Sequence, residues 1–139
     1  MKEQLKAVEK FHDAFGVKNE EFPSLVPENT FLLRYKLMAE ENDEYKEACF
    51  NGDIVEIADA LGDQLYILCG TILAHGLQDK IEEVFSEIQK SNMSKLGPDG
   101  KPIINDGTKD PSKPIGKVLK GPMYIEPDIA SVLYKHETN

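Results

Sequence analysis

One segment limits the possible folds more than any other, because it reads as a helix that is apolar on almost every side. It follows Asp53, which can cap it, and it continues to about His75 before Gly76 stops it. A helix of this kind belongs at the centre of a protein, covered by other helices. Three acids interrupt it, all on one narrow face and three or four positions apart: Glu56, Asp59 and Asp63.

The rest of the chain supplies the covering helices. Periodic apolar positions and cap residues predict helices over 2–15, from Asn29 or Thr30 to 50, over 79–91, and over a short final stretch, 127–134. After Met93 the sequence becomes rich in turn-forming residues. Two short extended pieces, 102–104 and 116–120, can pair as a β-hairpin. The prediction is therefore an all-α fold with a bundle of about four helices. It forms one domain over 1–139, divided into a helical body, 1–93, and a basic, irregular C-terminal arm, 94–139.

Charge and hydropathy exclude two classes of function. A net charge of −9 argues against a general nucleic-acid binder, whose surface would be basic. No uniformly apolar run of about 20 residues marks a membrane span. The charge is uneven, since residues 90–121 carry +4 and the remainder −13. A basic arm beside an acidic body suits an anion held through a metal, although a solvated lysine-rich loop explains the same composition.

The cysteines and the N-terminus indicate the compartment. Cys49 and Cys69 both fall inside apolar helical stretches, which predicts buried free thiols rather than a disulfide. The first four residues lead into a charged helical pattern and not into a signal peptide. Both observations predict a cytoplasmic protein.

Two acids of the second predicted helix lie where apolar side chains are expected. At about 100° per residue, Glu41 and Glu44 share a face with Leu37 and Ala48. A carboxylate that is buried without a partner is costly, and it would be neutralised unless a cation lay nearby. This placement is the first indication of a metal.

The turn at Asn51-Gly52 brings the two acidic helices together as a hairpin. Four carboxylates could then meet at one point, and such oxygen ligands suit Mg²⁺, with Mn²⁺ as the alternative. A zinc site would need histidine or cysteine, and a di-iron bundle would need Glu-x-x-His pairs that the chain lacks. Glu56 also has a second explanation, because Asp53-x-x-Glu56 resembles a capping box.

These acids form a recognisable pattern. The run Glu40-Glu41-Asn42-Asp43-Glu44, followed by Glu56-Ile57-Ala58-Asp59, resembles the EExxE…ExxD signature of the all-α NTP pyrophosphohydrolases. That superfamily includes MazG-like proteins, dimeric dUTPases and phosphoribosyl-ATP pyrophosphohydrolases. Residues 11–16 also resemble it, and the segments 91–95 and 117–122 look like the C-terminal part of the phosphoribosyl-ATP pyrophosphohydrolase-like branch.

The resemblance implies a role for each matching residue. Glu41 and Glu44, together with Glu56 and Asp59, match the metal ligands of the superfamily. Glu40 is a candidate to position or deprotonate the attacking water, with a solvated surface position as the alternative. The remaining matches are Asp63, which would bind metal indirectly or orient a lysine, and four candidates for contact with the nucleotide: Arg34, Asn92, Lys95 and Lys120. For Arg34 and Lys120 a role in packing or on the surface is an equal alternative.

The activity implied by the resemblance is metal-dependent hydrolysis of a nucleoside triphosphate between its α and β phosphates, which yields a monophosphate and pyrophosphate. Two alternatives remain open. One is a phosphoribosyl-ATP pyrophosphohydrolase of histidine biosynthesis, and the other is a non-catalytic helical scaffold that binds nucleotide or metal. The relatives are dimers or tetramers, and the apolar central helix also favours a homodimer or homotetramer.

Overall fold

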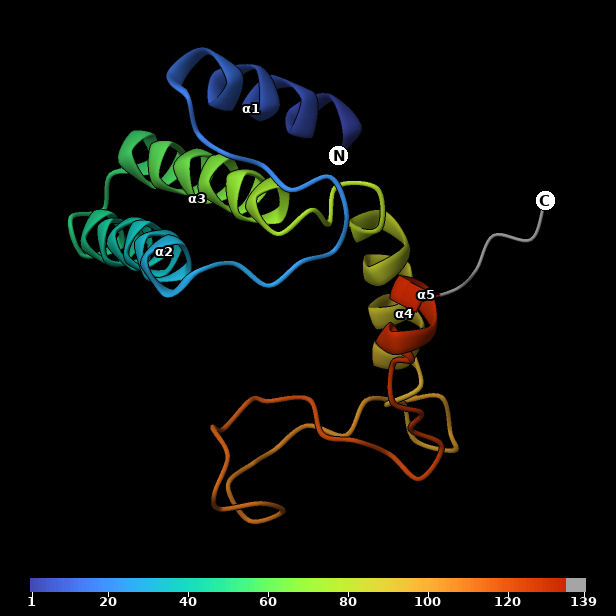
Figure 1. Ribbon diagram of the computed structural model, residues 1–139. Coiled ribbons are helices and arrows are strands. Elements are labelled where there is room, and N and C mark those ends of the chain that lie inside the picture. The colour runs from blue at the N-terminus through green and yellow to red at the C-terminus, as the bar shows by residue number, and fades with distance from the viewer. Residues whose placement is uncertain (135–139) are drawn as a thin grey trace. The chain divides into compact units, whose positions relative to one another are not determined.

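The computed structural model describes residues 1–134, and within them every regular element is a helix (Figure 1). The all-α prediction is confirmed. The chain divides into two compact units, residues 1–81 and residues 82 onward. The helices are α1 (Lys2–Phe15), α2 (Glu28–Phe50), α3 (Ile54–Ala74), α4 (Ile81–Met93) and α5 (Ile129–Tyr134).

Helix α3 is the centre of the first unit, as its apolar sequence predicts. Both α1 and α2 pack against it (Figure 1). The core lies mainly between α1 and α3, and partly buried side chains that follow α3 pack against it. Its members are Leu5, Val8, Cys69, Ile72 and Leu73, with Leu77 and Ile81 packed against them. Helix α3 is long and apolar enough to cross a membrane, but a core helix passes the same test.

The predicted cap of α3 is confirmed. The Asp53 side chain accepts hydrogen bonds from the backbone N–H groups of Val55 and Glu56, at 3.0 and 3.2 Å. These bonds satisfy two donors that the first turn of any helix leaves without a partner. The tight turn before Asp53 joins α2 to α3 as a hairpin.

The start of α2 differs from the prediction. The helix begins at Glu28, with Pro27 in the cap position, so neither Asn29 nor Thr30 caps it. The Pro27 carbonyl accepts the N–H groups of Thr30 and Phe31 at 3.0 and 3.1 Å. Proline can take this position because a cap residue supplies its carbonyl to the helix and needs no N–H of its own.

The connector between α1 and α2 is ordered because it is bonded to the far end of α3. The Glu20 N–H donates to the Leu73 carbonyl at 3.1 Å, and the Ser24 N–H donates to the His75 carbonyl at 2.9 Å. The His75 ring also bonds the Ser24 carbonyl, at 3.0 Å. The connector therefore places the start of α2 relative to the end of α3.

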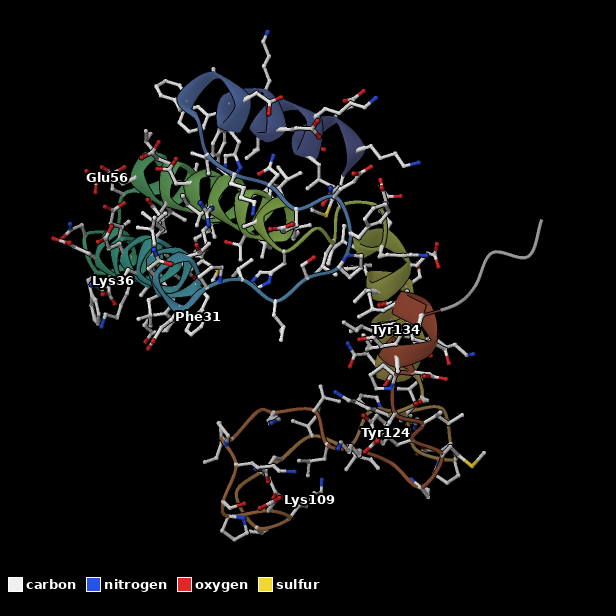
Figure 2. All side chains as sticks on the ribbon, viewed as in Figure 1. Phe31, Lys36, Glu56, Lys109, Tyr124 and Tyr134 are labelled. Atoms are coloured by element: carbon white, nitrogen blue, oxygen red, sulfur yellow. The ribbon has the colours of Figure 1, made fainter. Side chains whose placement is uncertain are left out.

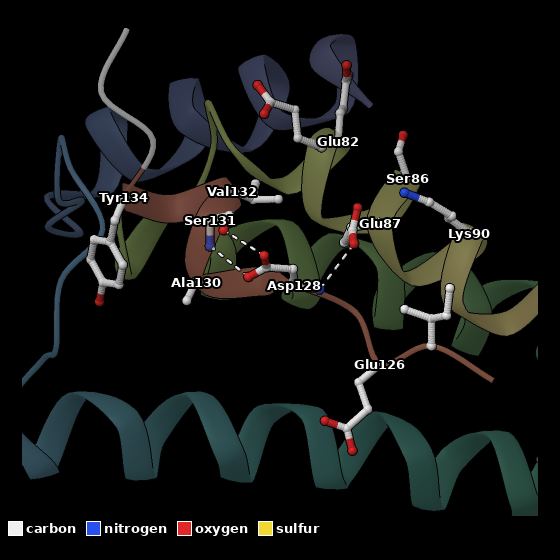
Figure 3. Close-up of a pocket in the computed structure, with 12 residues that line it drawn as sticks. Glu82, Ser86, Glu87, Lys90, Glu126, Asp128, Ala130, Ser131, Val132 and Tyr134 are labelled. Atoms are coloured by element: carbon white, nitrogen blue, oxygen red, sulfur yellow. Dashed lines mark hydrogen bonds between the residues drawn. The ribbon is translucent and has the colours of Figure 1, made fainter. Parts of the chain in front are cut away.

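The second unit contains two helices and a long irregular loop. The predicted β-hairpin is reduced to a single isolated antiparallel bridge, Ile104 with Val118, and residues 1–134 contain no strand. The start of α5 is close to its prediction, since the Asp128 carboxylate accepts both the N–H and the hydroxyl of Ser131 (Figure 3). The Asp128 N–H donates to Glu87 of α4, which fastens the two helices together.

A buried asparagine takes the place of a strand ladder in this loop. Asn105 is 1% exposed, and its side-chain amide donates to the carbonyls of Asp110, Lys113 and Pro114 at 2.9 to 3.1 Å. Its side-chain oxygen accepts the N–H groups of Gly107 and Asp110. One side chain thus closes the lysine-rich loop, in which Figure 2 labels Lys109.

Both cysteines are free thiols, but only one is buried. Cys69 lies in the core, as predicted. Cys49 is exposed, so the prediction of its burial was wrong. It shares an apolar face of α2 with Tyr35, and that face is left open as well, since Tyr35 is 65% exposed.

Candidate active site

Three carboxylates converge between α2 and α3. Glu41 and Glu44 come from α2, one turn apart, and Asp63 comes from α3. One oxygen of each lies within 4.8 Å of the others. Among residues 1–134, this is the one place where three such acids meet. The helical spacing of three puts the two glutamates on one face, and the hairpin sets that face against α3.

Glu41 is the group most affected by this convergence. Its pKa is raised from 4.5 to about 7, first by burial, then by a hydrogen bond with Glu44, and further by the negative charges of Glu44, Asp63 and Asp59. Two carboxyl groups that share a hydrogen bond must hold a proton between them. Without a cation, the cluster therefore keeps a proton near neutral pH.

The residues fit a divalent metal ion. One oxygen of Glu41, Oε2, is buried and has no hydrogen-bond partner. Oxygen ligands of Mg²⁺ stand about 2.1 Å from the ion, so opposite ligands are about 4.2 Å apart. The three oxygens lie within 4.8 Å of one another, which is the range in which ligands of one such ion are found. The donors are all hard carboxylate oxygens, which suit Mg²⁺ or Mn²⁺ better than zinc.

The other predicted ligands lie on α3 but outside the converging trio. Asp59 is close enough for its charge to raise the pKa of Glu41. Glu56 lies in the first turn of α3, where its N–H is held by the Asp53 cap; Figure 2 labels it at that end of the helix. Glu40, the candidate for the attacking water, is exposed on α2.

The structure places Arg34 inside the contact between α2 and α3. Its side chain is 7% exposed. Its Nε donates to the hydroxyl of Thr71 at 3.1 Å, and its Nη2 donates to the carbonyl of Ile67 at 2.9 Å. Burial lowers the pKa of the guanidinium. Arg34 was a candidate either for contact with the nucleotide or for packing. These contacts are those of a packing residue.

The remaining candidates for contact with the nucleotide all lie in the second unit. Asn92 and Lys95 are joined by a backbone hydrogen bond at the end of α4, and the Lys95 carbonyl accepts the N–H of Gly121 at 3.0 Å. The two sequence segments that the resemblance relates are therefore neighbours. Lys120 projects over the ring of Tyr124, with Nζ 4.6 Å from its centre.

A large hollow in the second unit is a poor match for a phosphate site. It is an open depression of about 1310 Å³ in the second unit, lined by α4, α5 and the residues before α5 (Figure 3). Four glutamates and an aspartate face it against one lysine, Lys90. Such a lining would repel a polyphosphate. The carboxylate trio between α2 and α3 has chemistry that suits a metal-bound phosphate better.

The position of Asp63 differs from what its predicted role implies. The prediction was that Asp63 binds metal indirectly or orients a lysine, whereas the structure places one of its oxygens within 4.8 Å of those of Glu41 and Glu44. The available signal was its position on the same face of α3 as Asp59, one turn further on. Helical spacing alone could not tell which turn of α3 lies opposite Glu41, because that depends on the register of the hairpin.

The raised pKa of Glu41 predicts how the metal-free protein responds to pH. Between pH 4.5 and about 7, the folded state binds a proton at Glu41 that the unfolded state has lost. The free energy of unfolding should therefore fall as pH rises through this range and level off above it. Melting temperatures measured in a chelator should show this slope, and Mg²⁺ should remove it.

Glu41→Gln is the control for this measurement, since it cannot lose a proton and should flatten the slope. Asp106, Asp110 and Asp128 do not interfere, because hydrogen bonds from neighbouring hydroxyl groups hold the pKa of each carboxyl below its ordinary 3.8. Their effect has the opposite sign and is lost at lower pH. An equal slope in the wild type and in Glu41→Gln would contradict the assignment.

A comparison with known families matches the part of the chain that holds this cluster. The phosphoribosyl-ATP pyrophosphohydrolase family model matches residues 8–92, which include α2, α3 and the acids of these two helices. None of the curated proteins compared with the chain matches it. Members of this family hydrolyse acid anhydrides of nucleotides and typically depend on a metal. The chain belongs to the phosphoribosyl-ATP pyrophosphohydrolase family, in the MazG-like superfamily of NTP pyrophosphohydrolases, and is a nucleotide pyrophosphohydrolase.

Proposed function

We propose that the chain hydrolyses a nucleoside triphosphate between the α and β phosphates and releases a monophosphate and pyrophosphate. One observation carries the proposal: three carboxylates converge in a member of a pyrophosphohydrolase family, and one of their oxygens is buried without a partner. The convergence brings like charges together, and a bound cation would relieve their repulsion.

In this proposal Glu41, Glu44 and Asp63 hold Mg²⁺, with Mn²⁺ as a substitute, and Asp59 and Glu56 complete the ligand set. The ion would neutralise phosphate charge and lower the pKa of a bound water. Loading the ion requires Glu41 to give up the proton that it shares with Glu44.

Polar and charged residues outside the ligand set are proposed to act on the water and on the substrate. Glu40 lies on the helix that carries two ligands, is exposed, and can accept a proton from the attacking water. Asn92, Lys95 and Lys120 supply the polar and positive groups that a polyphosphate needs as its charge redistributes. Their support is the backbone bond between residues 95 and 121, which brings the two basic segments together.

The family name makes phosphoribosyl-ATP the second candidate substrate. Phosphoribosyl-ATP contains the same α–β anhydride bond, so the same carboxylate cluster could hold the metal for its hydrolysis. The test is a screen of canonical and modified triphosphates and phosphoribosyl-ATP with Mg²⁺ or Mn²⁺, with products separated by ion exchange. We expect a monophosphate and pyrophosphate from at least one nucleoside triphosphate. Diphosphate and inorganic phosphate as products, or stabilisation by nucleotide with no turnover of any substrate, would overturn the proposal; the second result would favour a binding scaffold.

We also infer that the chain acts as a homodimer or homotetramer in the cytoplasm. Several large apolar side chains of α2 and α3 are exposed around a hollow of about 440 Å³ lined by Tyr35, Met38, Leu68 and three smaller or polar residues. Exposed apolar surface of this kind marks an interface. The free thiols support a reducing compartment.

Leu68→Asp should dissociate the oligomer, because it places a charge in the apolar hollow. Light scattering after size exclusion measures the mass directly, and Phe15→Asp, which changes an exposed apolar residue of α1, is the matched control. A wild-type mass of 15.6 kDa would contradict the inference.

A further inference from the structure

Arg34 is buried in an unusual setting. It is 7% exposed, and among residues 1–134 no carboxylate forms an ion pair with it. Its two hydrogen bonds go to neutral groups one turn apart on α3, the Ile67 carbonyl and the Thr71 hydroxyl, and that hydroxyl itself donates to the Ile67 carbonyl. A buried cation without a counter-charge is costly, so its position needs a reason.

The surface that receives Arg34 is made by a glycine. A Cβ at Gly70 would collide with Nη2 of Arg34 and would lie 3.0 Å from Nε2 of His12. His12 cannot give way easily, since it is 3% exposed and its other nitrogen bonds Asn19. The guanidinium could move, but only by breaking its bonds to α3. Gly70 is therefore required for Arg34 to stay in its place.

These contacts fix how far α2 is displaced along α3. Arg34 of α2 meets Ile67 and Thr71, whereas Glu41, two turns later, meets Asp63, one turn earlier on α3. This is the order expected for antiparallel helices. A slip by one turn would move α2 by about 5.4 Å and separate the carboxylates of the two helices.

We propose that Arg34, seated on Gly70, is a positioning residue that sets the register of α2 against α3 and so holds Glu41 and Glu44 opposite Asp63. The inference rests on the metal site of the proposed function. It replaces a direct role for Arg34 in binding the nucleotide. Lysine should not substitute, because a single ammonium cannot reproduce the fork of bonds to two groups on α3.

The test measures Mn²⁺ binding to the nucleotide-free protein by electron paramagnetic resonance. Arg34→Met and Gly70→Ala should each weaken Mn²⁺ binding at least about 10-fold, as loss of supporting contacts does in other metal sites. The double variant should be no weaker than either single one, and Arg34→Lys should not restore binding. Val8→Ala, which loosens the core between α1 and α3, is the control and should bind Mn²⁺ normally.

Kinetics separate the two roles of Arg34. At saturating Mn²⁺, the KM for nucleotide of Arg34→Met should stay within about 3-fold of the wild type, since the bound ion restores the cluster. Unchanged Mn²⁺ affinity together with a KM raised 10-fold or more would make Arg34 a nucleotide ligand and overturn the inference. Wild-type binding of Mn²⁺ by Arg34→Lys would overturn it too.

A metal-free measurement distinguishes failure of this inference from failure of the proposed function. Gly70→Ala should lower the midpoint of urea unfolding more in the wild type than in Arg34→Met, where no guanidinium is displaced and only the 3.0 Å approach to His12 remains. Equal shifts of the urea midpoint in both backgrounds would show that Arg34 does not depend on Gly70 for its position, and would overturn the inference. If the wild type binds no Mn²⁺ while this coupling is present, the proposed metal site is wrong. The packing of Arg34 on Gly70 would then be shown, but it would not serve to align metal ligands.

Discussion

Glu44→Gln should lower the rate of pyrophosphate release at least about 100-fold, because loss of a supporting contact to a metal ligand already costs about 10- to 100-fold and Glu44 is proposed as a ligand itself. Glutamine keeps the shape of the side chain and removes the charge that would neutralise the ion. Glu44 is also the partner in the hydrogen bond that keeps a proton on Glu41. The variant therefore alters the charge of the cluster without removing packed atoms.

The control for this change lies on the same helix. Glu47→Gln alters an exposed acid one turn further along α2, where no trio forms, and should leave the rate within about 2-fold, as surface changes usually do. Asp63→Asn should match Glu44→Gln if the two act as ligands of one ion. Turnover is measured as pyrophosphate released with excess Mg²⁺. Wild-type turnover in both Glu44→Gln and Asp63→Asn would refute the proposed site.

Most of the first unit follows from sequence periodicity. Apolar residues on every side of α3 predict a central helix, and both α1 and α2 pack on it. The placement of Glu41 among apolar neighbours predicts a carboxylate in need of a cation, and its pKa is raised to about 7 first by burial. Periodicity succeeds here because a helix presents its faces in a fixed order, whatever the rest of the chain does.

Periodicity says less where contacts depend on two elements at once. Spacing groups Glu56 with Asp59 on α3, but it does not indicate which acid of α3 meets Glu41 and Glu44; the structure brings Asp63 there. Which turn of α3 faces Glu41 depends on the register of the hairpin, and register is set by contacts such as those of Arg34 with Ile67 and Thr71. No pattern within a single helix contains that information.

The second unit shows a different limit. The extended pieces 102–104 and 116–120 predict a hairpin, but only one bridge forms, between Ile104 and Val118. Asn105 instead bonds five backbone groups of the following loop and takes over the closing role of a strand pair. Asparagine signals a turn in any sequence, yet nothing in the sequence says that this one is buried.

Gly76→Ala should destabilise the protein strongly. Gly76 ends α3 with φ +68°, a conformation that costs a residue with a side chain about 1–2 kcal/mol. A Cβ there would also collide with the Phe22 carbonyl oxygen and carbon, both backbone atoms. These atoms cannot turn aside, because the connector is bonded to α3 on both sides, at Glu20 and Ser24. Strain and overpacking together should cost about 3 kcal/mol or more.

Gly52→Ala separates the collision from the backbone strain. Gly52 has nearly the same φ, +63°, but a Cβ there would meet nothing within 4 Å, so the variant should lose only about 1 kcal/mol. Urea unfolding of the two variants measures the difference. Equal losses would mean that the connector does not press against the end of α3. A larger loss for Gly76→Ala would show that the connector, which leads directly into α2, is held by the helix that carries Asp63, so that both halves of the carboxylate cluster are positioned from α3.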